Sequence, residues 1–371
     1  MKLDQLETGQ KNDFISIINV YKKNSGTTNV ALMYLKAFKE INAKSELIQC
    51  TEGDDSDYVS DTATLLRGLR VPLTPMRIFM NRVLIFPRLV KWRYNHTLIF
   101  DPTMIFSGDK SKSVIYVHDL RALSAFEEKF GEYLFYLVIK VKLKNFRKIL
   151  VNSNFTRTVL MNIGISEERI KVIYPYVDIN NIGSHLALTL EKINDGLMLN
   201  VVYVANDLPY KNIAFFLSVA EYFDNRYPNL FKFELVSKIT SDTESSILKL
   251  GLKNLKVTRC VDDISDVYTQ SDIVLFPSKY EGFGLPMAEA ICFGLPVIAN
   301  TIPTAYEILG DSGLIIDVQN FDKWVQALLL LRNKDRYLHY ANKAIEKRAF
   351  FSKERFVEDV RTLVGEKWFV E

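Results

Sequence analysis

Short apolar runs rich in β-branched residues alternate along the chain with longer amphipathic stretches. Four clear runs span 14–20, 114–117, 199–205 and 273–276. Runs of this length, bounded by turn residues, are typical of strands buried on both faces of a parallel sheet. Because the stretches between them have helical periodicity, the pattern predicts repeated strand-helix units. The expected fold class is therefore α/β with doubly wound sheets.

The length of the chain predicts two domains. At 371 residues it exceeds the usual size of a single hydrophobic core. A polar, strand-poor interval over 179–195 is the predicted linker. We therefore expect an N-terminal domain over 1–180 and a C-terminal domain over 181–345, followed by a helical segment over 346–371.

Composition and charge narrow the setting. The net charge of +3 is too small to indicate nucleic-acid binding, so we expect no nucleic-acid partner. Cys50, Cys260 and Cys292 are scattered without metal-ligand spacing, which favours reduced thiols in a cytoplasmic protein. Residues 1–12 lack the apolar core of a signal peptide, and no stretch approaches about twenty uninterrupted apolar residues. Membrane contact, if any, is expected to be peripheral.

One long segment is strongly basic. Between Thr62 and Phe100 there is no acidic residue, and the basic residues are interleaved with large apolar ones. A second basic run covers 140–148. Such segments suit an anionic membrane surface on the cytoplasmic side, and equally suit solvated helix faces whose apolar sides pack into the first domain. The basic residues of the first segment are Arg67, Arg70, Arg77, Arg82, Arg88, Lys91 and Arg93.

The stretch from 273 to 290 combines a strand, a glycine turn, two carboxylates and a helix start. Glu281 precedes Gly282 and Gly284, and Glu289 follows with seven residues between the two acids. Glycines let the backbone approach a ligand closely, and the N–H groups entering the helix are unpaired donors at the positive end of its dipole. The stretch predicts a site for phosphate or sugar oxygens. Singly, the two acids also fit a solvated loop residue and a partner of the helix dipole.

This stretch resembles the E-x7-E signature of the retaining glycosyltransferases of family 4. The sequel over 290–299 and 307–317 resembles that family's following helix, strand and loop, and the resemblance covers most of the chain. It implies a GT-B fold, with two Rossmann-like doubly wound domains facing a central cleft. It also implies a final helix that packs back on the first domain, a task for which Phe356, Val360 and Leu363 are suited.

The resemblance also implies roles for the residues of the turn. Glu281 is expected to contact the donor sugar and Glu289 the ribose hydroxyls of the nucleotide. The backbone around the turn is expected to bind the donor. Its residues are Gly282, Phe283, Gly284 and Leu285.

Lys211 is the predicted diphosphate ligand of the C-terminal domain. A cation at a helix N-terminus opposes the helix dipole, so this lysine is better explained by a bound anion than by stability. The family commonly has Gly-Arg where this chain has Ala205-Asn206. Asn206 remains a predicted donor ligand, but it offers only neutral hydrogen bonds where the family's arginine offers a charge.

Two positions of the N-terminal domain complete the predicted site. His118 follows the strand run 114–117. The resemblance to family 4 implies that a histidine in this setting lies on the acceptor side of the cleft, near the reacting carbon. The alternative is a hydrogen-bonded structural histidine. Gly26 lies in the turn after the first strand, where it is expected either to approach a ligand or to serve as a plain helix entry.

Together these features predict a metal-independent, retaining hexosyltransferase with Glu281, His118 and Lys211 as its catalytic residues. The donor would be a GDP- or UDP-linked sugar, with mannose or glucose favoured, and the acceptor a glycan or lipid-linked saccharide. No metal and no cofactor beyond the donor are expected. The alternatives are a catalytically silent GT-B subunit of a glycosylation complex and a nucleotide-sugar epimerase or phosphorylase of the same fold.

Overall fold

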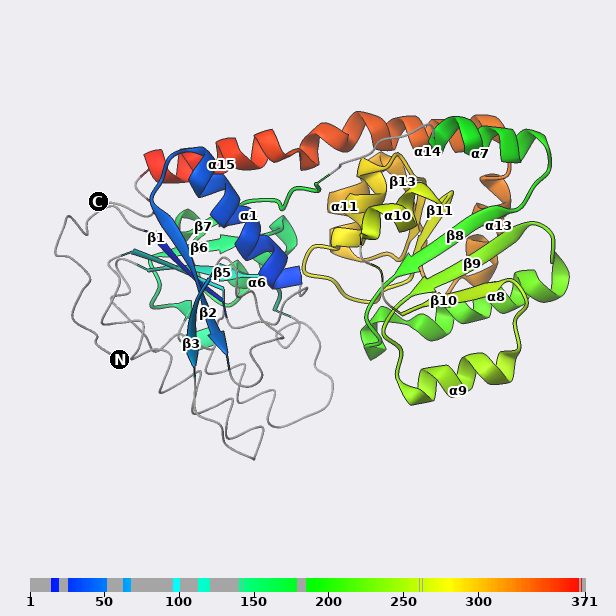
Figure 1. Ribbon diagram of the computed structural model, residues 1–371, viewed down its shortest axis with the longest axis horizontal. Helices are drawn as coiled ribbons and strands as arrows, with labels where there is room; N and C mark the ends of the chain where they lie inside the picture. The colour runs from blue at the N-terminus through cyan, green and yellow to red at the C-terminus, as the bar shows by residue number, and fades with distance from the viewer. Residues whose placement is uncertain are drawn as a thin grey trace. The chain divides into compact units, whose positions relative to one another are not determined.

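The protein folds into two units, and the chain passes from the first unit to the second and back again (Figure 1). The N-terminal unit comprises residues 1–176 and 354–371, and the C-terminal unit comprises 177–353. The predicted boundaries were 180 and 345. The computed structural model describes residues 15–19, 26–51, 63–67, 96–100, 113–120, 140–141, 143–178, 185–259, 261, 263–366 and 368.

The N-terminal unit is built on a parallel sheet of seven strands in the order β3-β2-β1-β4-β5-β6-β7. The strand order reverses between β1 and β4. Its strands are β1 (Ile15–Asn19), β2 (Ser45–Thr51), β3 (Ala63–Arg67), β4 (His96–Ile99), β5 (Ser113–Val117), β6 (Lys148–Val151) and β7 (Ile170–Val172). Its main described helices are α1 (Gly26–Glu40), α6 (Asn154–Asn162) and α15 (Lys353–Gly365).

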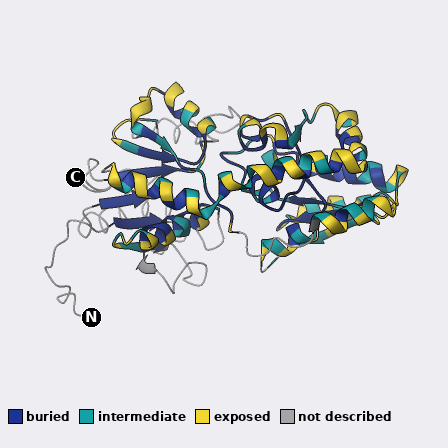
Figure 2. Cartoon of the chain, turned by 90° about the horizontal axis from the view of Figure 1, so that it is seen from above, coloured by how far each residue is buried: buried dark blue, intermediate teal, exposed yellow. Residues whose placement is uncertain are grey.

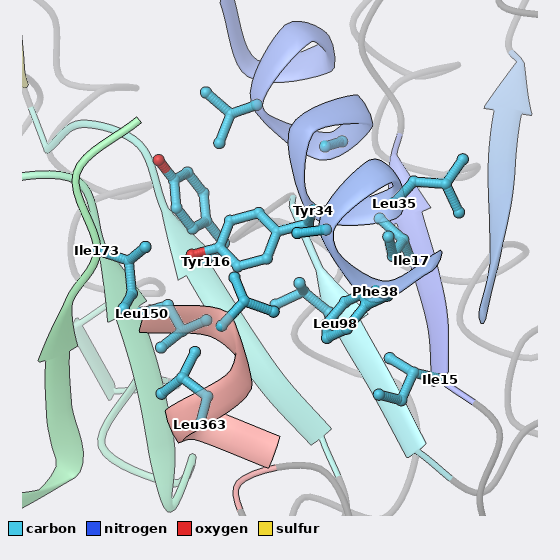
Figure 3. Close-up of a cluster of buried hydrophobic side chains, with 14 of the residues drawn as sticks. Ile15, Ile17, Tyr34, Leu35, Phe38, Leu98, Tyr116, Leu150, Ile173 and Leu363 are labelled. Atoms are coloured by element: carbon cyan, nitrogen blue, oxygen red, sulfur yellow. The ribbon is translucent and has the colours of Figure 1, made fainter. Parts of the chain in front are cut away.

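Alternate residues of these strands face two different helix layers. Ile17 of β1 and Tyr116 of β5 belong to the core under α1 and α15, whereas Ile18 and Val117 belong to the core that includes Leu160 of α6. Figure 3 shows the first of these cores, where Tyr34 and Phe38 of α1 lie with strand residues and with Leu363 of α15. The apolar run of each strand is therefore used on both faces, as the hydrophobic pattern predicts.

Helix α15 is held in the N-terminal unit by aromatic packing. Phe356 is 1% exposed, and its ring lies 5.0 Å from that of Tyr34 and 5.3 Å from that of Tyr176. Val360 and Leu363 extend the same buried face. The last described helix thus belongs to the core of the unit that begins the chain.

The C-terminal unit contains a parallel sheet of six strands in the order β10-β9-β8-β11-β12-β13. Its strands are β8 (Leu199–Val204), β9 (Phe231–Val236), β10 (Leu255–Thr258), β11 (Ile273–Phe276), β12 (Val297–Ala299) and β13 (Gly313–Ile315). Its α-helices are α7 (His185–Asn194), α8 (Ile213–Arg226), α9 (Ser241–Leu250), α10 (Ile264–Thr269), α11 (Leu285–Cys292), α12 (Pro303–Leu309), α13 (Phe321–Leu330) and α14 (Lys334–Lys347). The strand order reverses between β8 and β11, and α8 packs with α13 while α14 packs with α7 and α11.

The two sheets confirm the expectation of two doubly wound, Rossmann-like units. Figure 2 shows both sheets buried beneath helices that expose residues along their outer sides. Every residue of β1, β5 and β11 is buried. This matches the interpretation of the short apolar runs as strands covered on two faces.

The predicted linker over 179–195 is wrong for much of its length, because α7 occupies His185–Asn194. A buried acid explains why this polar stretch is helical and docked. The carboxylate of Asp272 accepts hydrogen bonds from the Thr189 hydroxyl, from Lys192 Nζ at 2.8 Å and from the backbone N–H of Asn200 at 2.7 Å. Polar residues of α7 therefore face the protein, which a hydrophobicity pattern does not reveal.

Most of the basic segment lies outside the described residues. Arg67 ends β3, whereas the six other basic residues between Arg70 and Arg93 fall in ranges that the structure does not describe. Within the described part of the second basic run, Lys144 and Arg147 are exposed. Among the described helices, none combines the length and apolar character needed to cross a bilayer.

Candidate functional site

The candidate site lies where the strand order of the C-terminal unit reverses. Strands β8 and β11 are parallel neighbours there, so the loops that follow them leave the same edge of the sheet. These are the β8 loop over 205–212 and the β11 loop over 277–284. In open α/β sheets this is the place where ligands bind, because the two crossovers leave in opposite directions and open a crevice.

The β8 loop brings Lys211 to this edge of the sheet through a tight turn. Asn206 is exposed, and Pro209–Lys211 forms a short 3-10 turn. Asn212 then adopts a left-handed conformation with φ of 58° and immediately precedes α8. Asparagine tolerates this backbone conformation better than most residues, so the turn can reverse direction immediately after the lysine.

Hydrogen bonds fasten the two loops to each other. The N–H of Lys279 donates to the carbonyl of Tyr210 at 2.7 Å, and Nδ2 of Asn212 donates to the carbonyl of Pro277 at 3.3 Å. The buried Tyr203 hydroxyl donates to the carbonyl of Lys211 at 2.6 Å and lies 3.0 Å from Oγ of Ser278. The backbone that carries Lys211 is therefore fixed relative to the backbone that carries Glu281.

Lys211 and Glu281 form a short, sheltered ion pair. Nζ of Lys211 lies 2.6 Å from Oε1 of Glu281, and the two side chains are 12% and 10% exposed. The ammonium also lies 5.3 Å from the ring centroid of Tyr210, which itself packs against Tyr280. The sequence predicts both residues as donor ligands, and the structure brings them together as partners.

The glycine turn after Glu281 is closely packed. Gly282, Phe283 and Gly284 are buried, and the Phe283 ring packs edge-on against Phe351. Gly284 has φ of +95°, and a Cβ atom there would collide with Cε of Met287. The positive φ favours glycine at this position, because an L side chain would be strained there, and a Cβ atom would also push the end of the Met287 side chain aside.

Helix α11 begins directly after this turn. Leu285 and Pro286 are its first residues and are partly exposed, and the carbonyl of Gly284 accepts from the N–H of Met287 at 2.9 Å. Proline at the second position costs no hydrogen bond, because the first N–H groups of a helix have no partner within it. The helix contains no acid in its first turn, so its positive end remains available to an anion.

Glu289 lies in the second turn of α11 and is held by a tyrosine. The buried hydroxyl of Tyr268 donates to Oε2 of Glu289 at 2.6 Å, and the Tyr268 ring stacks on Phe293. Burial raises the pKa of the Glu289 carboxyl, and the hydrogen bond from Tyr268 opposes this shift by favouring the ionised form. The contact holds Oε2, and Glu289 is partly exposed.

Tyr268 was not singled out by the sequence analysis. It stands at the end of α10, twenty-one residues before Glu289, and its pairing depends on how α10 and α11 pack. Asn300 was also missed. Its Nδ2 donates to the carbonyl of Ser278, and its Oδ1 accepts from the N–H of Val318, so it supports the β11 loop from the end of β12. No short motif marks either residue.

In the N-terminal unit, His118 directly follows β5 and is half-buried. Nδ2 of Asn152 donates to its carbonyl at 2.8 Å and lies 3.5 Å from Nδ1 of its ring. Gly26 is the first residue of α1, and the preceding loop lies outside the described residues. Nearby, Nδ2 of the buried Asn19 donates to the Thr28 hydroxyl at 2.8 Å.

The described residues contain no cluster of three or more His, Cys, Asp or Glu side chains placed to hold a metal ion. Cys50 and Cys292 are buried, and burial raises the pKa of the Cys292 thiol to about 12.

Comparison with known proteins gives a family match for the C-terminal unit. Residues 199–334 match the model of the family described as "Glycosyl transferases group 1". This range contains β8, β11 and α11, and with them Lys211, Glu281 and Glu289. Over this range the C-terminal unit is similar to glycosyltransferases of that group.

Two curated relatives are similar over a larger share of the chain. The "uncharacterized 41.2 kDa protein in cps region" of Klebsiella pneumoniae is 23% identical over 255 residues, which cover 67% of this chain and 68% of that protein. The O-antigen chain mannosyltransferase RfbU of Salmonella typhimurium is 25% identical over 219 residues, covering 58% of this chain and 59% of RfbU. The chain thus spans about three fifths of the length of RfbU.

The fold is similar to that of a protein of known structure. HepE of Anabaena, crystallised in complex with UDP and glucose, superposes with a TM-score of 0.72 at 16% identity and covers 95% of this chain and 98% of HepE. This similarity confirms the GT-B fold predicted from the sequence.

Proposed function

We propose that the protein is a retaining glycosyltransferase that moves a hexose from a nucleoside-diphosphate sugar to a glycan or lipid-linked saccharide acceptor. The observation that carries this proposal is the grouping of Lys211, Glu281 and the start of α11 where the strand order reverses. An ammonium and a helix N-terminus suit a diphosphate, and a carboxylate beside them suits sugar hydroxyls. The family match over 199–334 supports the assignment.

In this proposal the nucleotide is bound by α11 and the β8 loop. Glu289, oriented by Tyr268, accepts hydrogen bonds from the ribose hydroxyls. Lys211 and the N–H groups at the start of α11 hold the diphosphate, with the exposed amide of Asn206 as a further donor. Glu281 orients the transferred sugar.

The chemical step needs charge stabilisation more than a strong base. As the bond to the sugar breaks, negative charge develops on the departing diphosphate, and Lys211 together with the dipole of α11 stabilises it. In retaining transfer the acceptor hydroxyl attacks on the face that the diphosphate leaves, and the phosphate oxygen takes its proton. Because Lys211 supplies the positive charge, we expect transfer to persist in EDTA. His118 is proposed to contact the acceptor.

The first experiment is a nucleotide binding screen. Thermal unfolding of the purified protein is followed with GDP, UDP, ADP and their sugar conjugates. A ligand at about a hundred times its dissociation constant should stabilise the protein by roughly 2.7 kcal/mol. We expect one nucleotide to shift the parent and to lose most of its effect on Glu289→Ala and Lys211→Ala. NMR of the anomeric product then tests retention of configuration.

Mannose and glucose are the favoured sugars. The name of RfbU as an O-antigen chain mannosyltransferase supports the first, and the UDP and glucose bound to HepE support the second. The name of RfbU also favours an acceptor used in polysaccharide biosynthesis. Comparing GDP-mannose with UDP-glucose as donors decides between them, and transfer from neither would refute this preference.

The second candidate is a catalytically silent GT-B subunit. Asn206 favours it, because the family that the chain resembles has a charged arginine at this position. It predicts that no nucleotide shifts the unfolding temperature. Installing the charge as Asn206→Arg should tighten nucleotide binding in an active enzyme, because the side chain at this position of the β8 loop is exposed. A lack of binding by both proteins would favour the silent subunit.

We also propose that the basic segment from Arg67 to Arg93 docks on the cytoplasmic face of an anionic membrane, where a lipid-linked acceptor would be found. Its charge and interleaved apolar residues support this. Flotation with anionic vesicles should recover more protein than flotation with neutral vesicles, and equal recovery would refute it.

A further inference from the structure

The ion pair of Lys211 and Glu281 places a negative charge beside the proposed diphosphate ligand. The ammonium nitrogen and Oε1 are 2.6 Å apart, and both side chains are about nine-tenths buried. Solvent screens such a pair less than an exposed one. Any anion that binds this ammonium must therefore also interact with the Glu281 carboxylate.

Hydrogen bonds around the ion pair limit how far the two loops can move apart when an anion binds. The carbonyl of Lys211 is fixed by Tyr203, and the N–H of Lys279 is fixed by the carbonyl of Tyr210. Tyr203 also contacts Ser278, three residues before Glu281. Because these bonds tie the two loops together, the backbones that carry Lys211 and Glu281 are expected to stay close when an anion arrives.

The two natural ligands of such a site differ in how they meet this carboxylate. A nucleoside diphosphate without sugar offers only anionic oxygens on this side, and like charges within roughly 4–6 Å disfavour each other. A nucleoside-diphosphate sugar has one negative charge fewer and brings hydroxyl groups that donate to the carboxylate. The same residue is thus repulsive toward the spent nucleotide and attractive toward the intact donor.

We propose that Glu281 makes the site select the sugar-bearing donor over the spent nucleoside diphosphate, and so promotes product release after transfer. This inference rests on the proposed function, because it takes Lys211 as the diphosphate ligand. It assigns Glu281 a role in specificity that is separate from orienting the sugar. The pairing seen in the structure is the source of that role.

The test compares the affinities of both ligands in the parent and in Glu281→Gln. Glutamine keeps the size of the side chain and its hydrogen-bonding carbonyl but removes the charge. Dissociation constants are measured by calorimetry for UDP, UDP-glucose, GDP and GDP-mannose. We expect Glu281→Gln to bind the cognate diphosphate about tenfold more tightly and the sugar conjugate no more tightly. The preference for the sugar-bearing ligand should fall by about tenfold or more.

The control is Glu191→Gln, which removes one charge from an exposed position on α7. It should leave both affinities unchanged. Glu281→Ala is a second variant whose affinity for the diphosphate should also rise, and circular dichroism checks that each variant is folded.

The possible failures are distinguishable. Unchanged or weaker diphosphate binding by both Glu281 variants, with normal binding by the parent, overturns this inference and leaves the proposed function standing. Absence of any nucleotide binding by the parent overturns both.

Discussion

The two units have the same strand order around their reversal points but differ in what stands there. In the C-terminal unit the loops after β8 and β11 carry an ion pair, a glycine turn and the start of a helix. In the N-terminal unit the described strand ends show no comparable ion pair; there Asn19 donates to Thr28, Asn152 donates to the carbonyl of His118, and Asp119 is exposed. Shared topology positions the loops, and the charges on them decide which unit suits a diphosphate.

The units also differ in the kind of contact that holds α15 in the first and α7 in the second. The N-terminal unit holds α15 through the apolar rings of Tyr34, Tyr176 and Phe356. The C-terminal unit holds α7 through the buried carboxylate of Asp272. Apolar packing is visible in a sequence as periodicity, whereas a single buried acid is not.

Phe356→Ala should give the largest effect and should separate the two units. Removing a fully buried aromatic side chain from a packed core costs about 4 kcal/mol. We expect the N-terminal unit to unfold at lower denaturant concentration while the nucleotide-induced stabilisation of the C-terminal unit persists. Arg361→Ala, on the exposed side of the same helix, is the control. Loss of nucleotide binding in Phe356→Ala would contradict the expectation that the C-terminal unit binds nucleotide independently of the packing of α15.

Lys211→Met tests whether the charge of this lysine accounts for activity at the candidate site of the C-terminal unit. The substitution keeps the length of the side chain and removes the ammonium, so kcat/KM should fall by about a hundredfold or more, equivalent to about 3 kcal/mol. Lys279→Met changes an exposed lysine in the adjoining loop and should leave transfer nearly unchanged. Equal losses in the two variants would mean that overall charge, and not the position of Lys211, is responsible.

Asp272→Ala should weaken the anchor of α7. It leaves the Thr189 hydroxyl, the Asn200 N–H and the Lys192 ammonium without their carboxylate, at a cost of about 3 kcal/mol. Denaturant unfolding and amide exchange over 185–194 measure the effect. Asp266→Ala removes an exposed acid a few residues earlier and serves as the control.

Tyr268→Phe should give the smallest effect, as a shift in the pH dependence of nucleotide binding. The Tyr268 hydrogen bond favours ionised Glu289, so its removal raises the pKa of that carboxyl further. If ribose binding needs the ionised carboxylate, nucleotide affinity increases with pH in both proteins. In the variant the midpoint of this increase should lie about 0.5 to 1 pH unit higher. Tyr306→Phe, an exposed tyrosine, should not move it. A shift to lower pH would exclude the proposed role of Tyr268.

Much of the fold could be predicted because strand burial leaves a local signature. The run from Ile273 to Phe276 and the glycine turn before Pro286 predicted β11 and α11 within a residue. The helix α7 was missed because its docking depends on Asp272, some eighty residues away. Candidate ligands such as Lys211 and Glu281 could be predicted singly. Their pairing, and that of Tyr268 with Glu289, depends on tertiary packing that no spacing of residues encodes.

The division of the chain has a consequence for biosynthesis. The core of the N-terminal unit contains residues from β1, near the beginning of synthesis, and from α15, the last described helix to be made. The ribosome must therefore translate the whole C-terminal unit before the first sheet receives Phe356, Val360 and Leu363. During that interval the apolar face under α15 is open to solvent and to other chains. We expect nascent chains stalled before residue 353 to need chaperone protection, even though translation of their first unit began long before.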